Sequence, residues 1–268
     1  MQRHVSGNKK DSKLNGRGFT VLMIISCLIL LTGLGFLAVE PIKSLKREQI
    51  MGDAMDVMIS KMSEAVVTAN PEGEPDPENA GTDIEVTFIV PRDGNEAAGE
   101  EYDYFGDGED GDEADMSSIR AFISSRKAKL PKNVTLVCIG ILEIGKINKR
   151  LPVWNSTSTV ALRYGVGLYE YSMKPGQNGN ATILGHNMKN TTLFSKLYKL
   201  NVGDNVRFIK LDGHVQDYRI DKIEIVYKTK LAKYVDASAS DKPQLTLVTC
   251  ANDYGYGNRR VIICHPVK

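Results

Sequence analysis

Three residue types that carry acyl-transfer chemistry lie at the ends of predicted strands in the C-terminal half of this 268-residue chain. Cys250 ends the run LTLVTC and precedes the polar, glycine-rich ANDYGYGN. His186 follows the run ATIL, and Arg259 and Arg260 open the last apolar run. A strand end that opens into a loop holds a side chain rigidly and leaves it accessible to a substrate. These residues therefore form one candidate site.

The chemistry that such a set supports is nucleophilic attack on an acyl carbonyl. A thiol attacks as the thiolate, so its proton must be removed by a neighbouring group or its pKa of about 8.5 must be lowered. Histidine accepts that proton and returns it to a leaving amine, and a guanidinium stabilises an oxyanion. A plain structural interpretation also fits the spacing, with Cys250 as a small buried residue and His186 as a hydrogen-bonded one.

The elements that must position these residues are short β-type runs separated by turn residues, from Asn133 to the C-terminus. Seven or eight strands with little helix predict an all-β domain, either a closed barrel or a sandwich. Only residues 191–200 have helical spacing, with their leucines and Phe194 on one face. The predicted strands are VTLVCIGILEI, KINKRLPVW, ATILGH, NVRFIKL, HVQDYRIDKIEIVY, LTLVTC and RVIICHPV.

The N-terminal part of the chain has the pattern of a membrane anchor. Residues 18–39 are 22 residues without a charge, which is long enough for a helix to cross a hydrocarbon core of roughly 30 Å. The cation excess of residues 1–17 predicts that this tail is cytoplasmic and that the rest of the chain is outside. A cleaved signal peptide is the alternative, although the run exceeds the usual apolar region of about 7–15 residues. Residues 40–70 have amphipathic spacing and are predicted to form a helical stalk.

Charge separates the rest of the chain into two parts. Residues 71–116 carry 17 acidic and 1 basic side chains, and we expect a disordered acidic spacer, because this composition buries too little apolar area to offset chain entropy. Only Ile84 to Val90 interrupts it, as a lone strand or a docking segment. Residues 117–268 are the predicted catalytic domain. Its basic side chains are not interleaved with aromatic ones, so nucleic acid is not an expected partner.

Several of these segments together resemble sortases, the membrane-anchored cysteine transpeptidases of Gram-positive cell envelopes. The motifs are TLVTC (Thr246 to Cys250), the Arg-led strand after it, LPVW, the glycine-rich 165–180 segment and ILGHNMKN. The resemblance covers about half of the chain and implies a closed eight-stranded β-barrel with one or two short helices.

The resemblance also implies residue roles. Cys250 matches the nucleophile, His186 the family histidine, and Thr249 and Asn187 are candidates for substrate binding. For the arginine we favour Arg260, with Arg259 as the alternative, because Arg260 directly precedes the apolar triplet VII. Strand alternation allows only one of the two to face the site.

The reaction that the resemblance implies is cleavage of an LPxTG-like sorting signal and transfer of the acyl part to an amine. The implied partners are sorting-signal-bearing surface proteins or pilins, a peptidoglycan or pilin amine, and the membrane. No cofactor and no metal are implied. The GHN segment resembles class B, the glycine-rich segment resembles housekeeping and pilin sortases, and Asp103 to Phe105 faintly resembles a pilin-sortase lid. A non-catalytic envelope-binding domain and a hydrolase remain alternatives.

Overall fold

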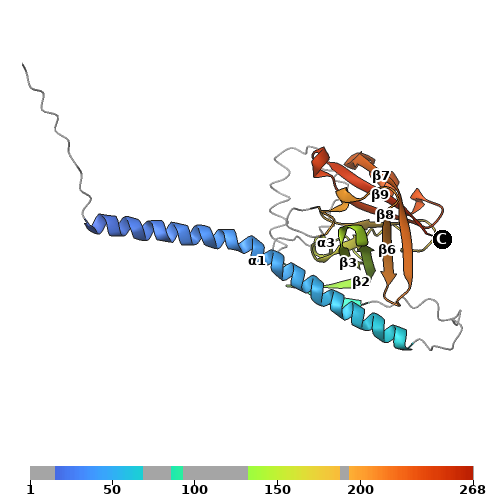
Figure 1. Ribbon diagram of the computed structural model, residues 1–268, viewed down its shortest axis with the longest axis horizontal. Coiled ribbons are helices and arrows are strands. Elements are labelled where there is room, and N and C mark those ends of the chain that lie inside the picture. The colour runs from blue at the N-terminus through green and yellow to red at the C-terminus, as the bar shows by residue number, and fades with distance from the viewer. Residues whose placement is uncertain (1–15, 69–85, 93–131, 188–192, 268) are drawn as a thin grey trace, which may run out of the picture. The chain divides into compact units, whose positions relative to one another are not determined.

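The computed structural model describes two compact units, which meet between Lys46 and Arg47. One helix, α1 (Gly16–Thr68), begins in the first unit and ends in the second (Figure 1). Within the described residues, no helix combines the length and the mean hydropathy that a membrane span requires. The described ranges are 16–68, 86–92, 132–187 and 193–267.

The second unit is built on a closed eight-stranded barrel, as the resemblance to sortases implies. Nine strands form one sheet in the order β1-β2-β3-β4-β5-β8-β9-β7-β6, and an antiparallel pairing of β2 with β6 closes the ring without β1 (Figure 1). The strands are β1 (Val86–Pro91), β2 (Asn133–Ile144), β3 (Lys149–Trp154), β4 (Val166–Leu168), β5 (Asn180–Leu184), β6 (Asn205–Lys210), β7 (Val215–Tyr227), β8 (Gln244–Cys250) and β9 (Asn258–Pro266).

The barrel interior is filled by alternate residues of every strand in the ring. On β8 these are Leu245 and Leu247, and on β9 they are Ile262 and Cys264. Successive side chains of a strand point to opposite faces, so Thr246 and Val248 of β8 lie on the outer face. This alternation decides which of the candidate residues share a side of the sheet.

Short helical segments connect the strands. They are η1 (Gly145–Ile147), α3 (Thr159–Tyr164), η2 (Leu197–Lys199), η3 (Lys228–Lys230), α4 (Ala232–Val235), η4 (Ala237–Ala239) and η5 (Asn252–Tyr254). The helix predicted over residues 191–200 is wrong in form, because only its single 3₁₀ turn η2 is helical in the part that is described. Its apolar face is nevertheless buried in the barrel core.

A second apolar cluster packs the end of α1 and the strand β1 against the outer face of β2. Ala54 and Met58 of α1 are buried there with Val86 and Val90 of β1. β1 pairs antiparallel with the first half of β2, from Val86 opposite Cys138 to Pro91 opposite Asn133. The run inside the predicted acidic spacer is therefore a docked strand. The rest of that spacer, the lid-like Asp103 to Phe105 and the first residues of the predicted domain lie outside the described residues.

The packing of α1 in this cluster should contribute measurably to the free energy of unfolding. We expect Met58→Ala to destabilise the protein by about 2–4 kcal/mol, because Met58 is 0% exposed and its truncation leaves a cavity. The adjacent Val57 is 43% exposed, so Val57→Ala should change stability by no more than about 0.5 kcal/mol. Urea unfolding of the full chain measures both values. Equal effects of the two substitutions would show that the helix does not dock here.

Candidate active site

Cys250 and Arg259 lie side by side at one end of the sheet. Cys250 is the last residue of β8, and the antiparallel register places it directly opposite Arg259 of β9. Residues directly opposite in an antiparallel pair have their side chains on the same face, close to one another. Both side chains therefore lie on the outer face of the barrel. Cys250 is half-buried and Arg259 is buried.

Arg260 lies on the other face of the same strand. It stands opposite Thr249, in line with the interior residues Ile262 and Cys264. Its Nη2 atom is 2.8 Å from Oδ2 of Asp253, and its guanidinium lies 5.7 Å from the ring centre of Tyr254. The register thus separates the two arginines and favours Arg259, the alternative, as the neighbour of the thiol.

His186 is held two residues beyond the end of β5. The ladder between β5 and β8 continues past Leu184, because the Gly185 backbone N–H donates to the Val248 carbonyl at 3.1 Å. Beyond it, the Phe194 backbone N–H donates to the His186 carbonyl at 3.1 Å. A Cβ atom at Gly185 would stand 2.6 Å from Cδ2 of Phe194, which is closer than real Cβ contacts. Glycine at this position therefore allows Phe194 to close over the strand end.

Side-chain hydrogen bonds join the residues on both sides of His186 to the end of β8. The Thr249 hydroxyl donates to the Gly185 carbonyl at 2.6 Å, and Nδ2 of Asn187 donates to the Cys250 carbonyl at 2.7 Å. Asn252 donates in turn to the Asn187 carbonyl at 3.4 Å. His186 is thus bracketed by two residues that are fixed to β8. The structure brings Cys250, His186 and Arg259 to one end of the β5–β8–β9 sheet.

Thr249 and Asn187 have structural contacts that the sequence did not reveal. Both residues stay candidates for substrate binding. In the structure Thr249 is fully buried, and its hydroxyl donates a hydrogen bond within the protein. The side-chain amide of Asn187 likewise binds the backbone of the proposed nucleophile. In the described structure these two residues hold the strand ends together.

An apolar row lies directly next to the three candidate residues. Leu184, Val248 and Val261 are register neighbours on β5, β8 and β9, each two residues from His186, Cys250 and Arg259 respectively. They form one buried cluster with Leu231 and Val235 of the crossover between β7 and β8. The outer face beside the thiol is therefore packed and dry, which limits the freedom of the candidate side chains.

The surroundings of His186 favour its neutral form. Burial, together with the positive charges of Arg163 and Arg47, lowers the pKa of the imidazole to about 4. Arg163 lies in the last turn of α3, and Arg47 lies on α1 at the start of the second unit. A neutral imidazole has a free nitrogen lone pair, so at neutral pH His186 is competent to accept a proton.

This pKa predicts how stability depends on pH. Between about pH 6.5 and pH 4 the unfolded chain binds a proton at His186 and the folded protein does not. The free energy of unfolding should therefore fall as the pH is lowered through this window, by up to about 3 kcal/mol from this group, and the contribution should level off below it.

The carboxylates also titrate in this range, so the test compares variants. We expect His186→Asn to remove this part of the slope between pH 7 and pH 4.5 in urea unfolding. His214→Asn serves as the control, because the His214 side chain is 85% exposed. An unchanged slope in His186→Asn would contradict the low pKa of His186.

Two contributors to the site were missed from the sequence. Arg163 is on α3, a helix that we did not predict, and only the fold brings its charge near His186. Asp253, three residues after Cys250, pairs with Arg260, and the sequence shows it only as one acid in a polar loop.

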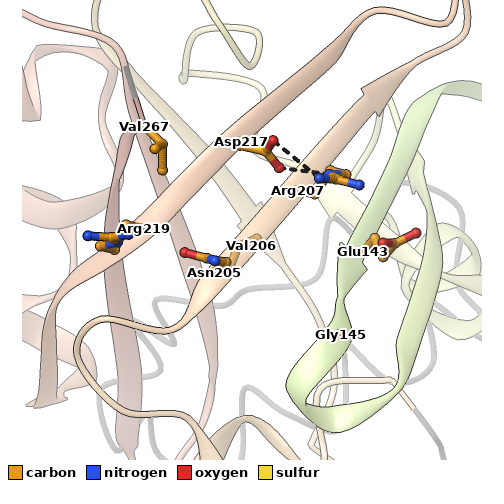
Figure 2. Close-up of a pocket in the computed structure, with 8 residues that line it drawn as sticks. All are labelled: Glu143, Gly145, Asn205, Val206, Arg207, Asp217, Arg219 and Val267. Atoms are coloured by element: carbon orange, nitrogen blue, oxygen red, sulfur yellow. Dashed lines mark hydrogen bonds and ion pairs between the residues drawn. The ribbon is translucent and has the colours of Figure 1, made fainter.

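A separate pocket lies elsewhere on the barrel, between β2, β6 and β7. Figure 2 shows Arg207 and Asp217 joined across it, with Nε of Arg207 donating to Oδ1 of Asp217 at 2.7 Å. Arg219 and Glu143 line the same pocket. None of the candidate catalytic residues lines it, so it is distinct from the site at Cys250.

The other described cysteines do not compete for the chemistry. Cys138 and Cys264 are both fully buried and both free. Burial raises the pKa of the Cys138 thiol to about 12 and also raises that of Cys264. Cys27 is free and exposed on α1. Cys250 is thus the described cysteine that is accessible at a strand end.

The comparisons with known proteins agree with the motifs. Residues 142–267 match the family model for the sortase domain. Sortase D of Bacillus subtilis (strain 168) is 36% identical over 111 residues, which are 41% of this chain and 53% of that protein. The chain thus spans about half the length of this curated relative.

Two solved structures are similar to about half of the chain. Sortase A from Corynebacterium diphtheriae is 28% identical, with 49% of this chain and 61% of that chain covered and a TM-score of 0.45. Sortase C of Streptococcus pneumoniae is also 28% identical, with 49% and 67% covered and a TM-score of 0.45. Residues 142–267, the part of the chain that matches the sortase-domain family, include His186, Cys250 and both arginines, so the chain is similar to sortases over this range.

Proposed function

We propose that this protein is a cysteine transpeptidase that cleaves an LPxTG-like sorting signal and transfers its acyl part to an amine. The observation that supports this most directly is the convergence of Cys250, His186 and Arg259 at one end of the β5–β8–β9 sheet. The match of residues 142–267 to the sortase domain agrees with acyl transfer through a thiol.

The first step forms a thioacyl bond. The Cys250 sulfur attacks the carbonyl of the Thr–Gly type bond while His186 accepts the thiol proton. The guanidinium of Arg259, on the same face as the sulfur, stabilises the negative charge that develops on the carbonyl oxygen. His186 then gives its proton to the leaving amine, the C–N bond breaks, and the C-terminal fragment departs.

The second step releases the acyl group. An amine attacks the thioester, His186 accepts a proton from that amine, and the Cys250 sulfur leaves and is reprotonated. The neutral resting state of His186, which follows from its lowered pKa, suits a base that must first accept a proton. Because the first product leaves before the amine reacts, ping-pong kinetics are expected.

The experiment is a peptide assay with the full chain. Sorting-signal peptides are incubated with a glycine-based amine, with a lysine-based amine and without any amine. Faster turnover and a ligated product with one amine support transfer and identify the acceptor as cross-bridge-like or pilin-like. Equal product with and without amine would indicate a hydrolase. No cleavage, together with no selective labelling of Cys250 by a sorting-signal mimic, would indicate a non-catalytic binding domain.

We further propose that the protein is a single-pass membrane protein with its catalytic domain outside the cell. The support is the uncharged run 18–39 and the cations that precede it. In this arrangement the partners are sorting-signal-bearing surface proteins or pilins. Release of the full chain from washed membranes at high pH, without detergent, would contradict the anchor.

A further inference from the structure

A buried polar network lies on the outer face of β5 and β8, toward the end of these strands that is opposite Cys250. Its members are two register pairs, Asn180 opposite Gln244 and Thr182 opposite Thr246. All four side chains are buried. Buried polar groups are costly unless they are hydrogen-bonded, so their partners indicate what the network does.

The network orients the side-chain amide of Asn180. Its Oδ1 atom accepts from Nε2 of Gln244 at 3.1 Å and from the Thr246 hydroxyl at 2.7 Å. Nε2 of Gln244 also donates to the Thr246 oxygen at 3.0 Å, which leaves the Thr246 proton for Asn180. With both donors on its oxygen, Asn180 must point its NH₂ group away from β8.

The NH₂ group of Asn180 points at the crossover between β7 and β8. Nδ2 donates to the Tyr234 carbonyl at 2.9 Å and to the Asp236 carbonyl at 3.1 Å. The Thr182 hydroxyl donates to the carbonyl between them, that of Val235, at 2.8 Å. Three successive backbone carbonyls of the crossover are therefore bound by two side chains of β5.

The same stretch of crossover covers the apolar row beside the candidate catalytic residues. Leu231 and Val235 pack in one cluster with Leu184 and Val248, which adjoin His186 and Cys250. Apolar packing alone is non-directional and leaves a segment free to slide. The hydrogen bonds to three consecutive carbonyls fix both the position and the register of the crossover.

We propose that Asn180 is a positioning residue of the acyl-transfer site. It fixes residues 231–236 over the outer face of β5 and β8, and that segment forms a wall of the space in which a peptide reaches Cys250. Asn180 contacts neither the substrate nor the reacting atoms. The inference rests on the proposed function and adds to it a role for Asn180, the last residue of the glycine-rich 165–180 segment.

The test substitutes Asn180 by Asp, which keeps the side-chain size and replaces the NH₂ donor by an oxygen that the crossover carbonyls repel. We expect KM for a sorting-signal peptide to rise at least about tenfold and kcat to stay within about threefold. Hydrogen exchange of the amides of residues 231–236 should accelerate. The rate at which a small thiol reagent modifies Cys250 should not change, because such a reagent does not bind against residues 231–236.

Two further variants make the test interpretable. Asn205→Asp is the matched control, because Asn205 is exposed at the start of β6 and should affect neither KM nor exchange. Thr182→Val removes the hydrogen bond to Val235 without changing the side-chain shape. It replaces Asn180→Asp if that variant does not fold, with a smaller rise in KM expected.

The outcomes separate the two proposals. Unchanged exchange at residues 231–236 in both network variants would overturn the anchoring role. Faster exchange with an unchanged KM would show that the network holds the crossover in place but does not position the site for the substrate. If the wild-type protein cleaves no sorting-signal peptide, the proposed function fails, and hydrogen exchange still decides whether Asn180 anchors the crossover.

Discussion

Replacement of Cys250 by Ala is expected to abolish both cleavage of a sorting-signal peptide and transfer to an amine. The sulfur is the atom that forms the thioacyl bond, and no other described cysteine is accessible at the strand ends that hold His186 and Arg259. The rate should fall by at least about 10⁴-fold, to the background of the assay. A coupled peptide assay that detects the released C-terminal fragment measures this directly.

His186→Ala should cause a loss of similar size, because the thiol and its base act as one unit. The double variant should then be no slower than either single variant, since effects within such a unit are not additive. Cys27→Ala is the matched control for loss of a thiol, because Cys27 is exposed on α1, in the other unit. Substantial activity in either Cys250→Ala or His186→Ala would rule out the proposed mechanism.

Stability must be measured alongside activity. Cys250 is half-buried at the end of β8, so its truncation to Ala should leave the thermal midpoint nearly unchanged. His186 is more constrained, because its neighbours Gly185 and Asn187 bind the end of β8. A folded, inactive His186→Ala variant therefore separates loss of the base from loss of the site.

The second large effect is expected for Arg259 and not for Arg260. Arg259 stands opposite Cys250 on the outer face, where a guanidinium can stabilise an oxyanion beside the sulfur. Removal of one such stabilising group costs about 10²–10³-fold in kcat. We therefore expect Arg259→Ala to lower kcat/KM by that amount, with little change in the thermal midpoint.

Arg260 is a natural matched control, because it is the adjacent residue, the same type and also buried. Its contacts are the carboxylate of Asp253 at 2.8 Å and the ring of Tyr254, both in the loop after Cys250. Arg260→Ala should therefore lower stability and loosen this loop, and should reduce kcat/KM by about tenfold or less. If Arg260→Ala lowers kcat/KM more than Arg259→Ala does, at unchanged stability, Arg260 is the catalytic arginine, as its position before the apolar triplet VII predicts.

The choice between the two arginines shows where sequence reasoning reached its limit. The side chains of a strand alternate with a period of two, so a shift of one residue in register exchanges Arg259 and Arg260 between the faces. That register is set by the loop from residue 251 to 257, in which Gly255 and Gly257 have positive φ angles and Ala251 N–H donates to the Asn258 carbonyl. Spacing along the chain does not reveal this geometry.

The helical segments were also predicted poorly from the sequence. The spacing of Leu193, Phe194, Leu197 and Leu200 predicted a helix, and the structure uses these residues as core with one 3₁₀ turn. Burial of apolar side chains next to the strand end outweighed the weak local helix preference. By contrast, α3 was missed because its six residues are too few to show a period.

The sequence by itself determined most of the strands and placed a candidate nucleophile and base at strand ends, and the resemblance to sortases implied the closed barrel. Alternating apolar residues specify strands locally, and the residue types at strand ends limit the available chemistry. Only the tertiary structure decided which arginine faces Cys250, how Thr249 and Asn187 bracket His186, and why the pKa of that histidine is low. These properties depend on cross-strand register, burial and charges from α1 and α3, which are contacts between residues far apart in the chain.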